Sequence, residues 1–483
     1  MERSERLAGM CTCCRRDFLQ AVGTAGAMGL VAIESPAGGA GPVSARAKKT
    51  AVVRGAFLYP PSKVLEKEGY WSWPGSSFDA EGHQRQYMAS FFAIEKKLGV
   101  RVAMDPEPLD QPESVARFIQ EVKQTKPDGL LLVPFKKGHW EHVLRIIRET
   151  ERPTVVLATL GVLLVDHINQ LHRQPGVYLI SALEDFRAVE YGITMIRTAR
   201  RMQDARIVSI NGTQYKAALV PQLGTEVRTI PHQRFVEEFQ RTGPDAEVLR
   251  LAKAYKENAK EIVEPSEADI LEAAKCYFTL KRLVSAERAD AIMMECLAGL
   301  RIPHKHVPPC MGFMSLRDEG IAAGCQADLS ATLTMMLVEQ LFDRPGFQQN
   351  AAMDTEQNLY FGAHCTCPSK MHGRTAPPEP YILRNHAEAG WGCVPRVLLT
   401  PGQEITMAQY LPGKEPKMYV YSGKVVRCPP IPPAGGCRTN VEMTIHEVSD
   451  VCDVKGMHQI IFYGNQARQL KAFCQLYGIA VVV

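Results

Sequence analysis

The chain has 483 residues, of which 46% are hydrophobic and 22% are charged, and its formal net charge is +4. This composition is that of a globular protein with a large core, and it excludes an intrinsically disordered chain. So small a charge over this length offers no field that would attract nucleic acid or an anionic membrane, so a small molecule is left as the expected partner. The length suggests roughly three domains.

The first 47 residues have the layout of a twin-arginine signal peptide. Arg15 and Arg16 precede a weakly apolar stretch, and Ala45-Arg46-Ala47 is a small-x-small cleavage site. The apolar stretch of about 13 residues is too short to cross a bilayer, which takes roughly 20. We expect residues 1–47 to be removed and the folded mature protein to be exported to the periplasm without a membrane span. The alternative is an ordinary basic start of a helix.

Cysteine use indicates reduced, buried thiols. The chain has 14 cysteines. Three lie within residues 1–47, so an odd number remains and at least one thiol must be free. Proteins that fold in a reducing cytoplasm keep cysteines reduced. We expect core positions for Cys276, Cys296, Cys310 and Cys325.

Residues 48–172 are predicted to form a first α/β domain. Short apolar runs alternate with amphipathic stretches, which is the rhythm of a parallel sheet with crossover helices. A turn at 126–129 precedes an apolar run typical of a strand buried on both faces. The expected strands are 51–58, 129–134 and 153–159, and the expected helices are 87–98 and 140–149.

A second α/β domain is predicted over residues 173–348. Apolar residues recur at helical spacing in several of its segments, and short apolar runs lie between them. The expected strands are 176–181, 205–210 and 289–296, and the expected helices are 186–200, 269–286 and 329–341.

From residue 349 to 483 the sequence changes to short β-type runs between Pro- and Gly-rich turns. Such segments suit a compact antiparallel sheet or barrel, here closed by a helix at 465–477. The expected strands are 396–399, 417–421, 424–428, 440–446 and 458–462.

Three common catalytic motifs are missing from the sequence. It contains no GxxxxGK[ST] phosphate loop, no strand-GxGxxG-helix pattern and no GxSxG elbow. Kinase, dehydrogenase and serine hydrolase functions are therefore disfavoured.

Carboxylates and imidazoles gather in the second half of the chain, where they would suit a divalent transition metal. The carboxylates also have ordinary roles, because Asp328 precedes a predicted helix that it would cap and Asp354 would cap a turn. His364 and His458 lie at strand ends, where side chains line clefts. His306 lies in a Pro-flanked linker and is expected to be exposed.

Four motifs follow one another in the second half: Gly324-Cys325-Gln326-Ala327-Asp328, Gly362-Ala363-His364-Cys365-Thr366, Arg384-Asn385-His386 and Gly456-Met457-His458. Over residues 290–483 this series resembles the L-fucose/L-arabinose isomerase family, and before that the likeness is architectural. The resemblance implies two Rossmann-like three-layer α/β domains followed by a β-rich, barrel-like domain, in a homo-oligomer.

The resemblance also implies an aldose–ketose isomerase that converts a free monosaccharide through an enediol. A divalent metal, typically Mn²⁺, would polarise the sugar carbonyl while a carboxylate moves a proton between C1 and C2. Carried over by motif, the metal ligands are Asp328, His364 and His458. The catalytic candidates are Asp328, Glu319 and Asp354, and the substrate-binding candidates are Gln326 and His386.

A separate prediction concerns the aromatic run Tyr70-Trp71-Ser72-Trp73-Pro74. Exposed aromatic rings near a strand end often stack on sugar rings, so Trp71 and Trp73 are further substrate-binding candidates. The alternative is core packing under a loop.

Two residues depart from the family pattern. Gln326 stands where relatives often have glutamate, and Gly299 stands where the fucose enzymes carry one. A neutral amide cannot act as a general base, so Glu295 or Glu319 would have to compensate. The alternative function is therefore a catalytically diverged carbohydrate-binding protein, or a metal-dependent carbohydrate enzyme of different chemistry. Another is a sensor of the periplasmic-binding type, with its cleft between the first two domains.

Overall fold

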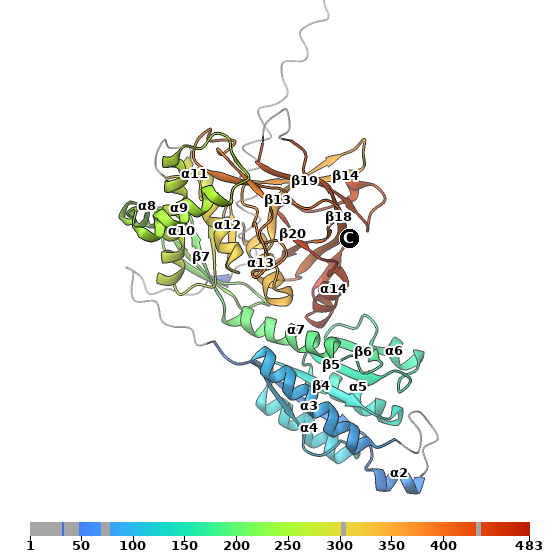
Figure 1. The fold of residues 1–483 in the computed structure, drawn as a ribbon. Coiled ribbons are helices and arrows are strands. Elements are labelled where there is room, and N and C mark those ends of the chain that lie inside the picture. Colours follow the sequence, from blue (N-terminus) through green and yellow to red (C-terminus); the bar gives the residue numbers. More distant parts are fainter. Residues whose placement is uncertain (1–30, 33–47, 69–77, 301–305, 431–435) are drawn as a thin grey trace, which may run out of the picture.

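The computed structural model describes residues 31–32, 48–68, 78–300, 306–430 and 436–483. The predicted signal peptide lies outside the described residues except for Val31 and Ala32, and Trp71 and Trp73 lie outside them as well. Figure 1 shows a smaller lobe and a larger lobe, with helix α7 (Phe186–Asp204) between them. The fold mixes parallel sheets with helices, so the predicted α/β class is confirmed. None of the described helices has both the length and the apolarity needed to cross a membrane.

The smaller lobe holds a five-stranded parallel sheet in the order β3-β2-β4-β5-β6. All six residues of β4 are buried, as expected of a strand covered on both faces. Its strands are β2 (Val52–Leu58), β3 (Arg101–Met104), β4 (Gly129–Pro134), β5 (Thr154–Thr159) and β6 (Val177–Ala182). Its helices are α2 (Ser62–Glu68), α3 (Ala80–Leu98), α4 (Pro112–Thr125), α5 (Trp140–Thr150) and α6 (Val165–Leu171).

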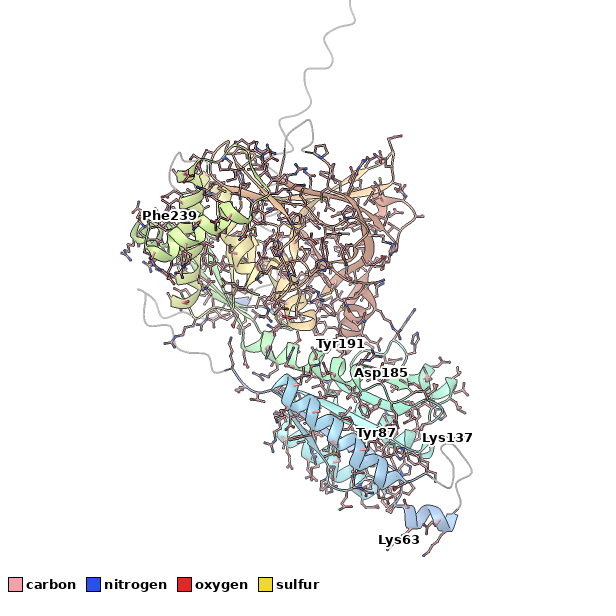
Figure 2. All side chains as sticks on the ribbon, viewed as in Figure 1. Lys63, Tyr87, Lys137, Asp185, Tyr191 and Phe239 are labelled. Carbon is pink, nitrogen blue, oxygen red and sulfur yellow. The ribbon has the colours of Figure 1, made fainter. Side chains whose placement is uncertain are left out.

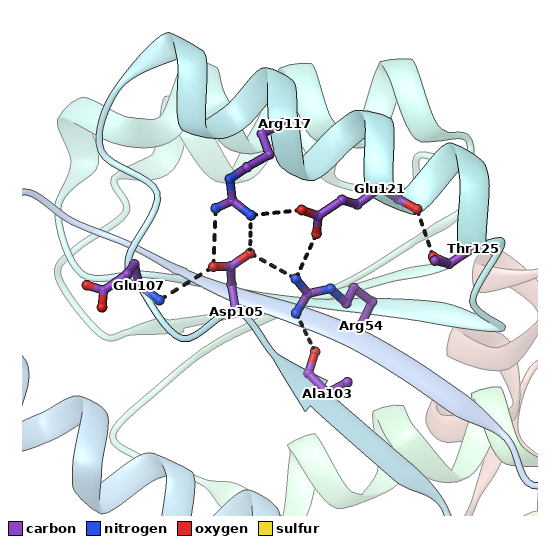
Figure 3. A network of polar contacts seen from close by, with 7 residues as sticks. All are labelled: Arg54, Ala103, Asp105, Glu107, Arg117, Glu121 and Thr125. Atoms are coloured by element: carbon purple, nitrogen blue, oxygen red, sulfur yellow. Dashed lines mark hydrogen bonds and ion pairs between the residues drawn. The ribbon is translucent and has the colours of Figure 1, made fainter.

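An ionic network fixes α4 to the strands of this sheet (Figure 3). Arg54 of β2 lies 2.9 Å from the buried Asp105 carboxylate and 3.1 Å from that of Glu121. Arg117 of α4 contacts the same two carboxylates at 3.2 and 3.0 Å. Each carboxylate thus has two guanidinium partners, and the hydrogen bond from Arg54 is the main cause of the lowered pKa of Glu121. The network is structural.

The predicted boundary between residues 172 and 173 does not separate two sheets. Strand β6 pairs in parallel with β5, from Thr154↔Val177 to Thr159↔Ala182, and therefore belongs to the first sheet. The strand–helix pattern is the same on both sides of residue 172, so the sequence carried no signal for the change of sheet. The change comes at α7, where Gly192 crosses β5 so closely that a Cβ would lie 2.9 Å from Val155.

The larger lobe begins with a six-stranded sheet in the order β1-β8-β9-β7-β11-β12. Strands β7 (Arg206–Ile210), β9 (Glu226–Ile230), β11 (Ala291–Met294) and β12 (Ala322–Cys325) run parallel, β8 (Lys216–Leu219) pairs antiparallel with β9, and β1 (Val31–Ala32) pairs antiparallel with β8. The carboxyl ends of the four parallel strands therefore share one edge. The helices of this part are α8 (His232–Arg241), α9 (Ala246–Asn258), α10 (Glu267–Ala286), α11 (Cys296–Leu300), α12 (Cys310–Asp318) and α13 (Leu329–Phe342).

The C-terminal part is β-rich, and its main sheet closes on itself. The antiparallel order is β17-β20-β13-β14-β19-β18, and β18 pairs again with β17. The strands are β13 (Phe347–Asp354), β14 (Leu359–His364), β17 (Glu404–Leu411), β18 (Lys417–Arg427), β19 (Thr439–Ile445) and β20 (Gln459–Tyr463). Strand β21 (Ala480–Val482) flanks β18, a small sheet holds β10 (Glu261–Ile262), β15 (Tyr381–Arg384) and β16 (Val394–Val397), and α14 (Ala467–Leu476) follows β20.

Two predicted strands, 417–421 and 424–428, form the single strand β18. The Gly423 between them resembles a turn residue in the sequence. In the structure it allows a close backbone approach, because a Cβ at this position would lie 2.0 Å from the Thr444 carbonyl oxygen.

Helix α7 holds the lobes together through aromatic contacts. Figure 2 shows Tyr191 on this helix at the junction of the lobes, and its hydroxyl donates to the carbonyl of Gln469 at 2.6 Å. Its ring stacks on Phe342 of α13, which in turn stacks on Phe462 of β20. Helix α7, helix α13 and strand β20 are thereby joined at the junction of the lobes.

Candidate active site

The structure brings Asp328 and His458 together, although they are far apart in the sequence. Asp328 follows β12 after a turn of two residues, and His458 directly precedes β20. The Asp328 Oδ2 atom lies 2.8 Å from His458 Nδ1, and Oδ1 accepts a hydrogen bond of 2.8 Å from the Ala331 N–H. The helix-capping role foreseen for Asp328 is thus confirmed, and the same carboxylate also contacts an imidazole. A carboxylate accepts hydrogen bonds, so His458 Nδ1 is the donor of this contact.

The backbone around this pair is strained. Gln326, Ala327 and His458 have φ values of 56°, 50° and 55°, in the left-handed region that L side chains rarely adopt. Such conformations cost of order 1–3 kcal/mol each and persist where surrounding contacts impose them. Here the Ala327 N–H donates to the carbonyl of Met294 at 2.9 Å. This turn lies between β12 and Asp328, whose carboxylate contacts His458 at the start of β20.

His364, the last residue of β14, faces the same place. Its ring centroid lies 5.7 Å from that of His458, and the side chain is buried. Its Nδ1 accepts from the Cys365 N–H at 3.0 Å and lies 3.3 Å from the Thr366 hydroxyl, while its buried Nε2 has no hydrogen-bond partner among the described residues. Burial and then the neighbouring His458 hold the pKa of His364 well below its ordinary range. His364 is therefore a neutral imidazole with one uncommitted nitrogen.

Two side chains position these groups, and neither was predicted from the sequence. Buried Arg317 of α12 donates to the Ala323 carbonyl at 3.0 Å and to the Thr366 hydroxyl at 3.2 Å. Gln348 of β13 bonds both backbone polar groups of Cys325, at 2.9 and 3.2 Å. They join the end of β12 to the segments that carry His364. An arginine on a short helix looks like a surface residue, because a buried guanidinium bonded to carbonyls has no sequence signature.

His386 is also buried near this place. Burial and the charge of Arg438 lower the pKa of His386 to about 4. The nearby His386 in turn contributes to the lowered pKa of His364. Its Nδ1 accepts from the Ala389 N–H at 3.2 Å. His386 is thus a neutral polar group near His364, and its role in substrate binding stays a prediction.

Glu319 and Asp354 lie elsewhere. Glu319 precedes the amino end of β12, opposite to Asp328, and its carboxylate accepts from the Tyr277 hydroxyl and from Lys281. Asp354 accepts from the N–H groups of the tight turn after it, and it pairs with Leu359 at the end of β14 remote from His364. The turn-capping alternative describes Asp354 fully, and neither residue enters the site as catalytic group.

Glu295 is better placed than either. It directly follows β11, whose last residue Met294 pairs with Cys325 at the end of β12. Glu295 and Gln326 therefore leave neighbouring strands at the same level of the sheet edge. Gln326 itself is partly buried within the strained turn.

His306 is buried, with 2% of its surface exposed, so the expected exposed position is wrong. Its Nε2 lies 3.1 Å from His232 Nε2, and its Nδ1 donates to the Val307 carbonyl at 2.8 Å. A Cβ on Gly299 would lie 1.7 Å from His306 Nε2. The imidazole of His306 thus fills the space of a side chain at position 299. The flanking prolines led to the prediction of an exposed loop, which did not foresee this packing role.

The donor types at the site fit a divalent cation. One carboxylate and two neutral imidazoles suit a transition metal, and the buried Nε2 of His364 has no other partner in the described structure. Because His458 Nδ1 donates to Asp328, His458 would ligate an ion through Nε2. As they stand, however, no three His, Cys, Asp or Glu side chains of the described segments are grouped to enclose an ion. Ion binding would therefore require His364 to approach the pair.

Comparison with protein-family models and with curated proteins gives no match for this chain.

Proposed function

We propose that the protein is a metal-dependent aldose–ketose isomerase that acts on a free monosaccharide through an enediol. The observation that carries the proposal is the convergence of three motif residues: the Asp328–His458 contact of 2.8 Å and the adjacent, uncommitted Nε2 of His364. The parallel sheets and the closed antiparallel sheet support the accompanying layout of two Rossmann-like domains and a barrel-like domain.

In this proposal Asp328, His364 and His458 hold the divalent ion, with Mn²⁺ as the first choice. When bound, the ion supplies Lewis-acid polarisation of the sugar carbonyl. The protein's part is to keep both imidazoles neutral, which burial does for His364. Ligation through His364 Nε2 would require the ring proton to shift to Nδ1 and the hydrogen bond that Nδ1 accepts from the Cys365 N–H to be given up.

The proton-transfer step needs a base that Gln326 cannot supply. We assign it to Glu295, the carboxylate that leaves the sheet beside Gln326. Its carboxylate would take the proton from C2 of the aldose while the O2 proton passes to O1, giving the enediol as its anion, and would then return the proton to C1 to form the ketose. No oxidant or reductant is consumed. Gln326 and His386 would hydrogen-bond the sugar hydroxyls.

The test is ketose formation from L-fucose, L-arabinose and D-arabinose by the purified protein with Mn²⁺. We expect turnover of at least one sugar, its loss in Glu295→Gln and His364→Ala, and its retention in His446→Ala. His446 is the matched control because it is an exposed histidine of the same barrel. Failure of the wild-type protein to convert any of these sugars, or full activity of Glu295→Gln, would contradict the proposed reaction.

One observation favours a second candidate, a diverged protein that binds carbohydrate without isomerising it. Position 326 holds an amide, and His306 fills the space beside Gly299. At both positions the family pattern has a glutamate, so this chain lacks two carboxylates at the carboxyl edge of the sheet. Sugar binding by calorimetry in the absence of turnover, weakened in Gln326→Ala, would select this candidate. Export to the periplasm and homo-oligomerisation remain part of the proposal.

A further inference from the structure

A polar cavity lies at the amino edge of the six-stranded sheet, opposite to the carboxyl edge that carries Asp328. Its volume is about 320 Å³, within the range of small-molecule sites. Its walls come from the chain entering β2, from α7 and α13, and from the amino ends of β11 and β12. It therefore lies where the two lobes meet, on the side of the sheet away from Asp328.

The charges in its walls do not balance. Lys48 pairs with Asp290, and Arg200 pairs with Asp204. Lys49, Arg197 and Arg201 have no carboxylate within ion-pair distance in the part of the chain that the structure describes. The third carboxylate of the walls, Glu339, lies 3.4 Å from Arg374, so three cations line the cavity without an ion-pair partner among the described residues.

Arg197 and Arg201 are held side by side. They lie one helical turn apart on α7, and both donate to Gln340 of α13, Arg197 to its backbone carbonyl at 3.1 Å and Arg201 to its side-chain oxygen at 2.8 Å. The buried Nε of Arg197 has no acceptor among the described atoms. Burial and then the neighbouring Arg201 lower the pKa of Arg197 to about 10, against a smaller opposing effect of Glu190.

We propose that this cavity binds a small organic anion whose phosphate or carboxylate group is held by Arg197 and Arg201. Planar guanidinium groups match both kinds of oxyanion through paired hydrogen bonds. The oxyanion would give Arg197 Nε its missing acceptor and remove the repulsion between the arginines, and Lys49 adds a third positive charge. Since the walls come from both lobes, occupancy would also stabilise their packing.

The experiment is isothermal titration calorimetry of the full-length protein at low ionic strength, with inorganic phosphate, glucose 6-phosphate, citrate and glucose as probes. We expect at least one anion to bind and glucose to give no heat at this site. The anion that binds most tightly assigns the class, phosphate or carboxylate.

Loss of one charge-assisted hydrogen bond should weaken anion binding about tenfold in Arg201→Gln and in Arg197→Gln. Arg187→Gln is the control, because Arg187 lies on the same helix with its side chain 93% exposed. Because Arg201 is exposed, Arg201→Gln should fold more readily than Arg197→Gln, and circular dichroism will show whether each variant is folded. Absence of binding by all three anions, or equal affinity in Arg187→Gln and Arg201→Gln, would overturn the proposal. The outcome is independent of the isomerase proposal, because His364→Ala should bind the anion like the wild type.

Discussion

The two edges of the second sheet are built in opposite ways. At the carboxyl edge, neutral imidazoles and a carboxylate converge from three distant segments, and a strained backbone turn directs them. At the amino edge, two arginines of a single helix line a cavity and have no ion-pair partner among the described residues. We propose a metal and a sugar as the ligands of the first edge and an organic anion as the ligand of the second. One sheet thus separates a proposed reaction site from a proposed binding site.

The largest effect is expected at the carboxyl edge from Asp328→Ser. Serine keeps the helix cap but removes the carboxylate that contacts His458, so the free energy of unfolding should change by less than about 0.5 kcal/mol. The kcat/KM for ketose formation should fall about 1000-fold, or about 4 kcal/mol. Steady-state kinetics and urea unfolding measure the two quantities. Unchanged kcat/KM in Asp328→Ser would mean that Asp328 is not part of the reaction site.

At the amino edge, the buried Glu339 should make stability depend on pH. Burial raises its pKa to about 7 from the ordinary 4.5, so between these values the folded state keeps a proton that the unfolded state loses. Its contribution therefore falls as pH rises from about 4.5 to 7, by about 3 kcal/mol in total, and then levels off.

Glu339→Gln should lose this slope when unfolding is measured across that pH range. Glu257→Gln is the control, since the Glu257 side chain is exposed on α9. Parallel pH profiles for wild type and Glu339→Gln would show that Glu339 keeps no extra proton on folding.

Gly299→Ala is expected to cost about 2 kcal/mol, because the new methyl group would overlap the ring of His306. The double variant with His306→Ala should recover part of this loss. Gly413→Ala serves as control, since a Cβ there meets nothing within 4 Å. Thermal unfolding gives the comparison, and an unaffected Gly299→Ala would mean that the two positions do not share this space.

The smallest effect is expected from Ala327→Gly, which should stabilise the fold by about 1 kcal/mol by relieving the left-handed backbone. Ala259→Gly, at a position with an ordinary φ of −72°, should not stabilise. If Ala327→Gly destabilises as much as Ala259→Gly, the turn before Asp328 is not strained.

Much of the fold was predictable because local pattern decides it. The fully apolar run at 129–134 could only be a doubly covered strand, and the helix at 329–341 was recognisable from its spacing. The change of sheet after β6 was not predictable, since strand pairing depends on tertiary contacts.

The site was predictable only in part. Asp328, His364 and His458 were found from motifs, and their proximity needed the structure. The burial of His306 and the positioning role of Arg317 arise from long-range packing, which leaves no local sequence signal.

The most direct test of the reaction site is the manganese content of the purified protein after dialysis, measured by mass spectrometry. We expect about one Mn²⁺ per chain in the wild type and in His446→Ala, and a loss of bound metal in His364→Ala. A wild-type protein that retains no divalent metal after loading would contradict the proposed centre of Asp328, His364 and His458.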